Sequence, residues 1–289
     1  MLVLFTDTDC DVTPKIAEEY GYNLISMPYS IEGKTTYPYV DFEKFDDHAF
    51  YDVLRSGTIP NTSAVSREVY LSYFEPVFAA GNDILYVHFS RAMSASFDAM
   101  DQAVAELKEK YPEREFYSID TKHISIGCLY TVRLVGDLYK SGMSAREIVE
   151  TVTKEVDHVA LYFFADDLRF FKHSGRVSGL AGIMGTLLGI RPIIYIGDDG
   201  KMVSIGKEKG RKKAIENLLS RMETLGDSVA DHRILVAHTD CPDLAAEVIA
   251  EIRNRFGKDI DIELSPVNPT IGSHCGPNCI GLCFHATHR

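Results

Sequence analysis

The 289-residue sequence lacks an excess of positive charge, a long apolar segment and the usual glycine-rich phosphate motifs. Its formal net charge is −12 at pH 7. An acidic protein repels a phosphate backbone, so we expect no nucleic-acid partner. The longest weakly polar stretch, Gly179–Ile190, is far shorter than the ~20 residues that cross a bilayer, so stable membrane insertion is not expected either.

Targeting and disulfide signals are also missing. The N-terminal segment "MLVLFTDTDCDV" begins apolar but has neither the basic region nor the small-residue cleavage site of a signal peptide. It is typical of a buried strand, and we expect a cytoplasmic protein. In the cytoplasm the six cysteines are expected to be reduced rather than paired.

Apolar runs of strand length alternate with helical patterns along most of the chain. Strands are predicted at 2–5, 23–31, 83–89, 115–119, 158–165 and 233–239, and helices at 13–21, 66–81, 94–111, 125–140 and 211–226. This alternation predicts an α/β fold with mostly parallel sheets. A "DDGK" turn within residues 191–206 predicts a hairpin. The length favours two domains, 1–155 and 156–289, with a ligand near their interface.

Three loops carry polar groups that can bind an anion. Thr62 and Ser63 lie in "IPNTSAVS", and Ser94 opens the helix after the strand at 83–89, where free N–H groups attract negative charge. No G-x-G-x-x-G or G-x-x-x-x-G-K-S/T motif occurs in the loop that carries Ser94, so dinucleotide and P-loop sites have no support there. Arg176, flanked by small residues, can donate to a carboxylate or phosphate. For the hydroxyls, taken segment by segment, helix capping is the favoured interpretation, and for the arginine a solvated turn stays equally open.

Two further clusters raise the question of a metal. Asp7, Asp9 and Asp11 follow the first strand, but no calcium-loop pattern is present, so turn formation is favoured. Cys275, Cys279 and the third cysteine, Cys283, are spaced four apart, which along a strand separates neighbours by ~13 Å. That spacing is too wide for one zinc ion. Buried cysteines acting as small apolar side chains are the favoured interpretation.

Five segments, in sequence order, resemble the motifs of the DegV family of bacterial lipid-binding proteins. "FTDTDCDV" is similar to T-D-S-x-x-D-L, "NTSAVS" to T-S-Q-P-S, and "SRAMSASFDAM" to S-S-x-L-S-G-T-Y-x-S-A. "HSGRVSG" with the following "RPIIYIGDDGKM" resembles G-G-R-I-S, a K-P-I-L strand and a D-G-x-I turn. "IGSHCGPNCIGLCF" resembles I-G-x-H-x-G-P-G-x-x-G. No one motif is decisive, but the ordered series is specific and covers nearly the whole chain.

The resemblance implies a two-domain fold and a ligand. The fold would have an N-terminal α/β/α domain with a parallel sheet and a C-terminal α/β domain with a mixed sheet. A long-chain fatty acid would lie in a buried tunnel, with its carboxylate bound by Thr62, Ser94 and His274 and with Arg176 beside it. His274 is expected on a loop before the last strand. The small and aliphatic residues of Gly179–Ile190 would suit the bottom of the tunnel.

The resemblance also implies a partner. A fatty acid kinase would phosphorylate the bound acid, and the acyl phosphate would lead to phospholipid. The chain itself would not be an enzyme and would need no cofactor or metal. Two hydroxyls, an imidazole and a helix N-terminus can bind a carboxylate, but they form no obvious pair of nucleophile and base.

Two alternative functions stay open, and three residues differ from the family motifs. A phosphotransferase related to dihydroxyacetone kinase would need a nucleotide site, and a metal or redox protein would use the C-terminal cysteines. Ala95 and Ser96 stand where the family motif has glycine and threonine, and Asn278 stands where it has glycine. These changes affect the two loops that would meet the carboxylate.

Overall fold

The computed structural model describes residues 1–180 and 189–289. It confirms the α/β class, with one parallel sheet, one mixed sheet and a small antiparallel sheet. No helix within the described residues is long and apolar enough to cross a membrane. Most of the segment Gly179–Ile190, expected to line the bottom of a tunnel, lies outside the described residues.

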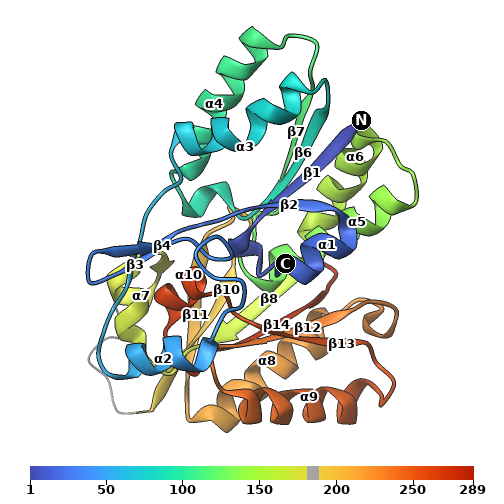
Figure 1. The fold of residues 1–289 in the computed structure, drawn as a ribbon. Coiled ribbons are helices and arrows are strands. Elements are labelled where there is room, and N and C mark those ends of the chain that lie inside the picture. Colours follow the sequence, from blue (N-terminus) through green and yellow to red (C-terminus); the bar gives the residue numbers. More distant parts are fainter. Residues whose placement is uncertain (181–188) are drawn as a thin grey trace.

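The parallel sheet forms the centre of a three-layer arrangement (Figure 1). Its strands, in spatial order, are β2 (Tyr22–Ile25), β1 (Leu2–Asp7), β6 (Asp83–His88) and β7 (Phe116–Asp120). One face is covered by α3 (Arg67–Ala79) and α4 (Ser96–Lys110), and the other by α1 (Pro14–Tyr20), α5 (Ile126–Lys140) and α6 (Ala145–Glu155). This is the α/β/α arrangement expected for the N-terminal part.

Local sequence signals fix several helix ends. Thr13 caps α1 by accepting a hydrogen bond from the backbone N–H of Ile16, and Gly21 ends the helix with φ 75°. Ser144 and Glu147 form a reciprocal capping box at the start of α6. Each cap satisfies backbone groups that a helix end leaves without partners.

The mixed sheet follows in the second half of the chain. Its spatial order is β13 (Ile262–Pro266), β12 (Ile234–His238), β14 (Ile280–His285), β8 (Val159–Phe164), β10 (Ile190–Ile196), β11 (Met202–Lys209) and β9 (Val177–Ser178). The β10–β11 pair is antiparallel, which confirms the predicted hairpin. Helices α8 (Arg211–Leu225) and α9 (Pro242–Phe256) cover one face of this sheet.

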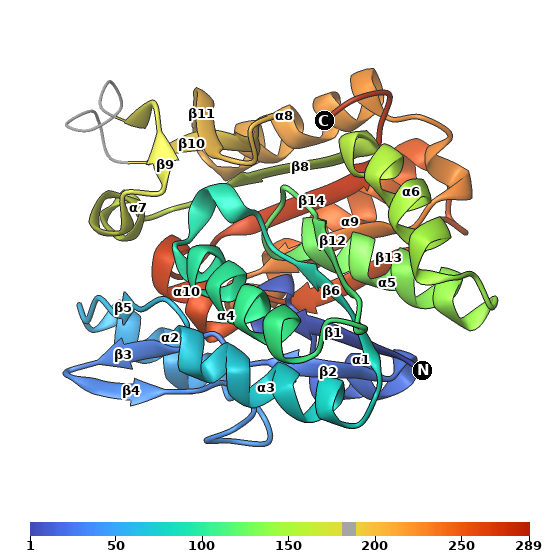
Figure 2. The same cartoon turned by 90° about the horizontal axis from the view of Figure 1, so that it is seen from above.

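Helix α5 packs on the other face of the mixed sheet and also contacts the parallel sheet. It touches β6 on one side and β8, β12 and β14 on the other. Its side chains are therefore buried around most of the helix, as expected for a core helix. Gly136 permits the close approach of α1, since a Cβ there would overlap the ring of Tyr20. Figure 2 shows α5 beside β12 and β13, as seen from above.

A third sheet corrects two predictions. The strand predicted at 23–31 is split into β2 and β3 (Tyr29–Ile31), because the chain leaves the parallel sheet after Ile25. β3 pairs with β4 (Lys34–Thr36) and with β5 (Asn61–Thr62). Thr62, expected in a loop, therefore lies in a short strand opposite Tyr29. Helices α2 (Asp47–Arg55) and α7 (Leu168–Ser174) border this region.

The prediction that His274 lies on a loop is wrong. It lies in α10 (Pro269–Cys275), whose N-cap Asn268 accepts hydrogen bonds from the first free amides. Pro269 suits the first helical position. Gly276 follows the last residue with φ 68° and ψ −176°, a region open almost only to glycine.

The division into units 1–155 and 156–289 stays a prediction. The parallel sheet draws its strands only from residues before 155 and the mixed sheet only from residues after it. The two ranges nevertheless interlock, since α10 contacts α2, β3 and β5, and α5 contacts the mixed sheet.

Gly276 should tolerate alanine far less well than Gly175. Both have φ near +67°, but Gly175 (ψ 13°) is in the left-handed helical region and has open space around it. A Cβ at Gly276 would overlap the Phe170 ring. We expect Gly175→Ala to cost about 1–2 kcal/mol and Gly276→Ala roughly 3 kcal/mol or more. Chemical denaturation of the two variants measures this, and equal losses would contradict the packing at α10.

Candidate functional site

A cavity lies at the carboxyl ends of β1 and β6, against the inner face of the mixed sheet. It holds about 1080 Å³ of space between atoms, its open mouth included. Its apolar walls include Phe89, Ile126, Leu161, Phe163, Phe171, Met202, Ala237, Val267 and Ile271. A parallel α/β sheet commonly binds ligands at this end of its strands.

All four residues singled out in the sequence line this one cavity. Thr62 comes from β5, Ser94 from the loop before α4, Arg176 from the turn before β9 and His274 from α10. The Thr62 hydroxyl and the Nε2 atom of His274 are 3.0 Å apart and share a hydrogen bond. The fold thus brings together residues up to 212 positions apart in sequence.

Ser96 was missed in the sequence as a site residue. Its hydroxyl accepts hydrogen bonds from Ser94 Oγ at 3.0 Å and from the Val65 backbone N–H at 3.0 Å. Ser94 Oγ in turn accepts from the backbone N–H of Ser96 at 3.2 Å, so Ser94 satisfies an amide at the start of α4. Ser96 therefore ties the loop that carries Ser94 to the segment that carries Thr62. Its only signal in the sequence was its place in the motif.

His274 is held in its neutral form. Burial, and to a lesser degree the nearby Arg176 and His173, lower the pKa of His274 to about 4. A neutral imidazole has one donor and one acceptor nitrogen. The Thr62 hydroxyl and His274 Nε2 are bonded to each other, and both can turn to donate hydrogen bonds to an incoming anion. A bound anion would raise the pKa of His274.

The polar end of the cavity is its open end. Arg176 and Ser63 are exposed, and Thr62 and Ser94 are partly exposed. The walls on β8, β12 and the start of α5 are almost completely buried, as at Ile126. The Arg176 guanidinium is anchored by a 2.6 Å hydrogen bond to the carbonyl of Ser174. The cavity therefore runs from a polar, solvent-facing mouth into the apolar interior.

The three aspartates lie where β1 ends in a turn, as predicted, with Asp7 the last residue of the strand. Thr8–Cys10 is a single 3-10 turn, and Asp11 follows it with φ 51°. Burial raises the pKa of Asp7 to about 7 and the pKa of Asp11 to about 6, although hydrogen bonds oppose both shifts. These carboxyls are therefore partly protonated near neutral pH.

The C-terminal cysteines lie in three successive elements of the chain. Cys275 ends α10, Cys279 lies before β14, and Cys283 lies within β14. All are free and buried, and burial raises the pKa of Cys283. Cys275 and Cys279 line the cavity, whereas Cys283 does not. Within the described part of the chain, no group of three potential metal ligands includes a cysteine.

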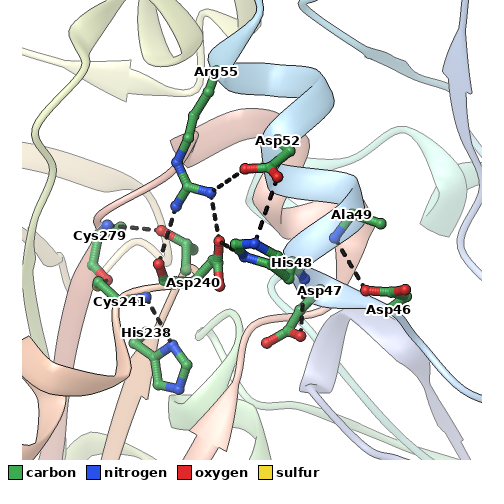
Figure 3. Close-up of polar contacts among 11 residues, drawn as sticks. Asp46, Asp47, His48, Ala49, Asp52, Arg55, His238, Asp240, Cys241 and Cys279 are labelled. Carbon is green, nitrogen blue, oxygen red and sulfur yellow. Dashed lines mark hydrogen bonds and ion pairs between the residues drawn. The ribbon is translucent and has the colours of Figure 1, made fainter.

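One group of metal-ligand type does occur among the described residues, and it contains no cysteine. His48, Asp52 and Asp240 offer ligand atoms within 4.8 Å of one another (Figure 3). Arg55 already bonds both carboxylates, Asp52 at 2.9 Å and Asp240 at 2.5 Å. Asp240 also holds His48 at 3.0 Å, which raises the pKa of His48. The cluster is an ion-pair network joining α2 to the loop before α9.

Sequence comparison decides the family. The sequence profile of the DegV family, described as uncharacterised proteins, matches residues 1–287. The chain belongs to the DegV family. A DegV domain-containing protein of Clostridium perfringens is 31% identical over 283 residues, covering 98% of this chain and 96% of that protein.

Solved DegV structures share the whole fold. A DegV family protein from Thermus thermophilus, whose structure is described as showing fatty acid binding, has a TM-score of 0.85 at 21% identity and covers 99% of both chains. A stearic acid-binding protein from Eubacterium ventriosum has a TM-score of 0.88 at 18% identity and covers 99% of this chain and 98% of its own. At these identities the likeness establishes the fold.

The buried carboxyl of Asp7 should leave a pH signature on stability. Its pKa is about 7 in the folded chain, against an ordinary value of 3.8 for an unburied aspartate. Between these values the folded chain keeps a proton that the unfolded chain has lost, so stability falls as pH rises from about 4 to about 7. Compared with Asp7→Asn, the wild type should lose up to about 1.4 kcal/mol per pH unit in this window.

Urea denaturation from pH 4 to pH 8 measures the difference between the two proteins. Asp11→Asn is the matched comparison, because the pKa of Asp11 is about 6 and its window should end about one pH unit lower. Parallel stability curves for the wild type and Asp7→Asn would contradict the burial of Asp7.

Proposed function

We propose that this protein binds a long-chain fatty acid in the cavity and holds its carboxylate at the polar mouth. Thr62, Ser94 and His274 would donate hydrogen bonds to the carboxylate, and Arg176 would supply positive charge beside it. The observation that carries the proposal is that these residues, from four separate segments, line the polar end of one cavity whose other walls are mostly apolar. The solved relatives described as binding fatty acids support the ligand class.

The chemistry of the site favours binding over catalysis. The Thr62 hydroxyl and the neutral His274 are adjacent, but no buried carboxylate among the described residues orients the imidazole as a base, as a catalytic triad requires. Hydroxyl and imidazole groups can hold a carboxylate without forming a bond to it. We infer that the chain acts as a carrier that is not itself an enzyme.

The orientation of the acid suits transfer to a partner. With the tail among buried residues such as Ile126 and Leu161, the carboxylate would face the exposed Arg176 and Ser63. A kinase could then reach the carboxylate without extracting the tail. We propose a fatty acid kinase as that partner, forming an acyl phosphate on the bound acid.

Head-group selectivity tests the carboxylate site. The wild type, freed of lipid, should bind oleate more tightly than methyl oleate, which lacks the charge. Hydrogen bonds to a charged group contribute about 1.5–3 kcal/mol, so Ser94→Ala or His274→Ala should weaken oleate binding roughly ten- to a hundredfold. Binding of methyl oleate should change much less, because its tail contacts remain. Competition against a fluorescent fatty acid measures both ligands.

Two exposed positions provide controls for these variants. Ser72 on α3 and His288 near the C-terminal end are exposed or partly exposed and do not line the cavity, so Ser72→Ala and His288→Ala should keep the wild-type preference. If the wild type and the Ser94 and His274 variants discriminate equally between acid and ester, the head group lies elsewhere.

A further inference from the structure

Three carboxyl groups lie at the end of β1 and in the turn that follows it, and two of them have hydrogen-bond partners. Asp7 Oδ2 accepts from the Tyr86 hydroxyl at 3.0 Å. Asp11 Oδ1 accepts from the backbone and side-chain nitrogens of Asn268, each at 2.9 Å. Neither Asp7 nor Asp11 lines the cavity. Asp9, between them, differs in both respects.

Asp9 is a buried carboxyl group that faces the cavity without a partner. It is 8% exposed and forms part of the cavity wall. Its Oδ1 atom is buried and has no hydrogen-bond partner among the described residues. Its backbone carbonyl, by contrast, accepts from Ser125 N–H at 2.9 Å. A buried polar group left unpaired is destabilising, so its position in a binding cavity calls for a ligand atom.

The charge state of the Asp9 carboxyl determines which kind of ligand atom it can bind. Burial, followed by the neighbouring Asp7 and Asp11 carboxylates, raises the pKa of Asp9 well above its usual range. The raised pKa favours the protonated, neutral form of the group, which has an O–H to donate. A protonated carboxyl pairs well with a hydroxyl or carbonyl oxygen and offers no negative charge to a cationic amine.

We propose that Asp9 hydrogen-bonds an oxygen atom, hydroxyl or keto, on the chain of the bound fatty acid, so that the protein prefers oxygenated over plain saturated acids. This inference rests on the proposed function and names its ligand class more narrowly. Asp9 is then a specificity-determining residue and takes no part in holding the carboxylate.

The position of Asp9 places the oxygen in the middle of the chain. Thr8, next to Asp9, binds Asn268 at the start of α10, since its carbonyl accepts from Asn268 Nδ2 at 2.7 Å. His274 lies six residues further along the helix, a rise of about 9 Å. A hydroxyl beside the carboxylate would be too close to the mouth to reach Asp9, whereas one near the middle of an extended chain would be suitably placed.

Competition binding with stearate, 2-hydroxystearate, 10-hydroxystearate and 12-hydroxystearate tests the inference. The wild type should bind 10- or 12-hydroxystearate roughly three- to tenfold more tightly than stearate, the effect of one neutral hydrogen bond. The 2-hydroxy acid should show no such gain. Asp9→Leu should abolish the preference, and Asp9→Asn, which retains a donor, should keep part of it.

Thr6→Val is the matched control. Thr6 Oγ1 is also buried without a partner among the described residues, but Thr6 does not line the cavity, so this variant should keep the wild-type preference. The inference would be overturned if the wild type bound stearate as tightly as every hydroxystearate, whatever the variants do. It would also be overturned by a preference that survives in Asp9→Leu, or by tighter binding of stearylamine. Failure to bind any of the acids would instead refute the proposed function.

Discussion

The hydrogen bonds of Asn268 hold the two halves of the cavity together. Its backbone and side-chain nitrogens donate to Asp11, and its side chain also donates to the carbonyl of Thr8. Its Oδ1 accepts from the first free amides of α10. One buried side chain thus joins the end of β1 to the helix that carries His274, across 257 residues of sequence. Each unpaired group left by its loss would cost about 1–3 kcal/mol.

The cavity has two kinds of surface. The mouth is polar and partly exposed, because Thr62 ends the two-residue edge strand β5 and Ser94 lies in the loop before α4. The interior is apolar, because α5 and the mixed sheet present buried side chains to it. An amphipathic ligand matches that division, and a small, wholly polar substrate does not. Asp9 interrupts the apolar part, which is why a plain saturated chain would leave one protein group unsatisfied.

The sequence predicted the longer helices and strands well, but it did not predict α10 or β5. Continuous apolar runs identified β1, β6 and β8, and helical patterns identified the long helices. Helix α10 was missed although Asn268, Pro269 and Gly276 mark its ends, because it has only seven residues and Gly272 weakens its helical pattern. The two-residue strand β5 depends on pairing with β3, and no local signal predicts such a contact.

The candidate site could be predicted only in part. Residue chemistry alone favoured helix capping over anion binding for Thr62 and Ser94, and the resemblance to the DegV motifs grouped them with His274. Their shared cavity is a property of the fold. Asp9 could not be recognised from the sequence, because its turn position gave it an ordinary role. Its burial and its lack of a partner arise only from tertiary packing.

Lipid extraction tests the central claim most directly. The protein should be purified from several bacterial hosts, extracted under denaturing conditions and examined by mass spectrometry, with the delipidated protein then titrated with oleate and stearate derivatives. We predict a long-chain fatty acid close to one per chain in each preparation, and recovery of binding after delipidation. Preparations that contain no fatty acid, together with a delipidated, folded protein that binds none, would contradict this claim.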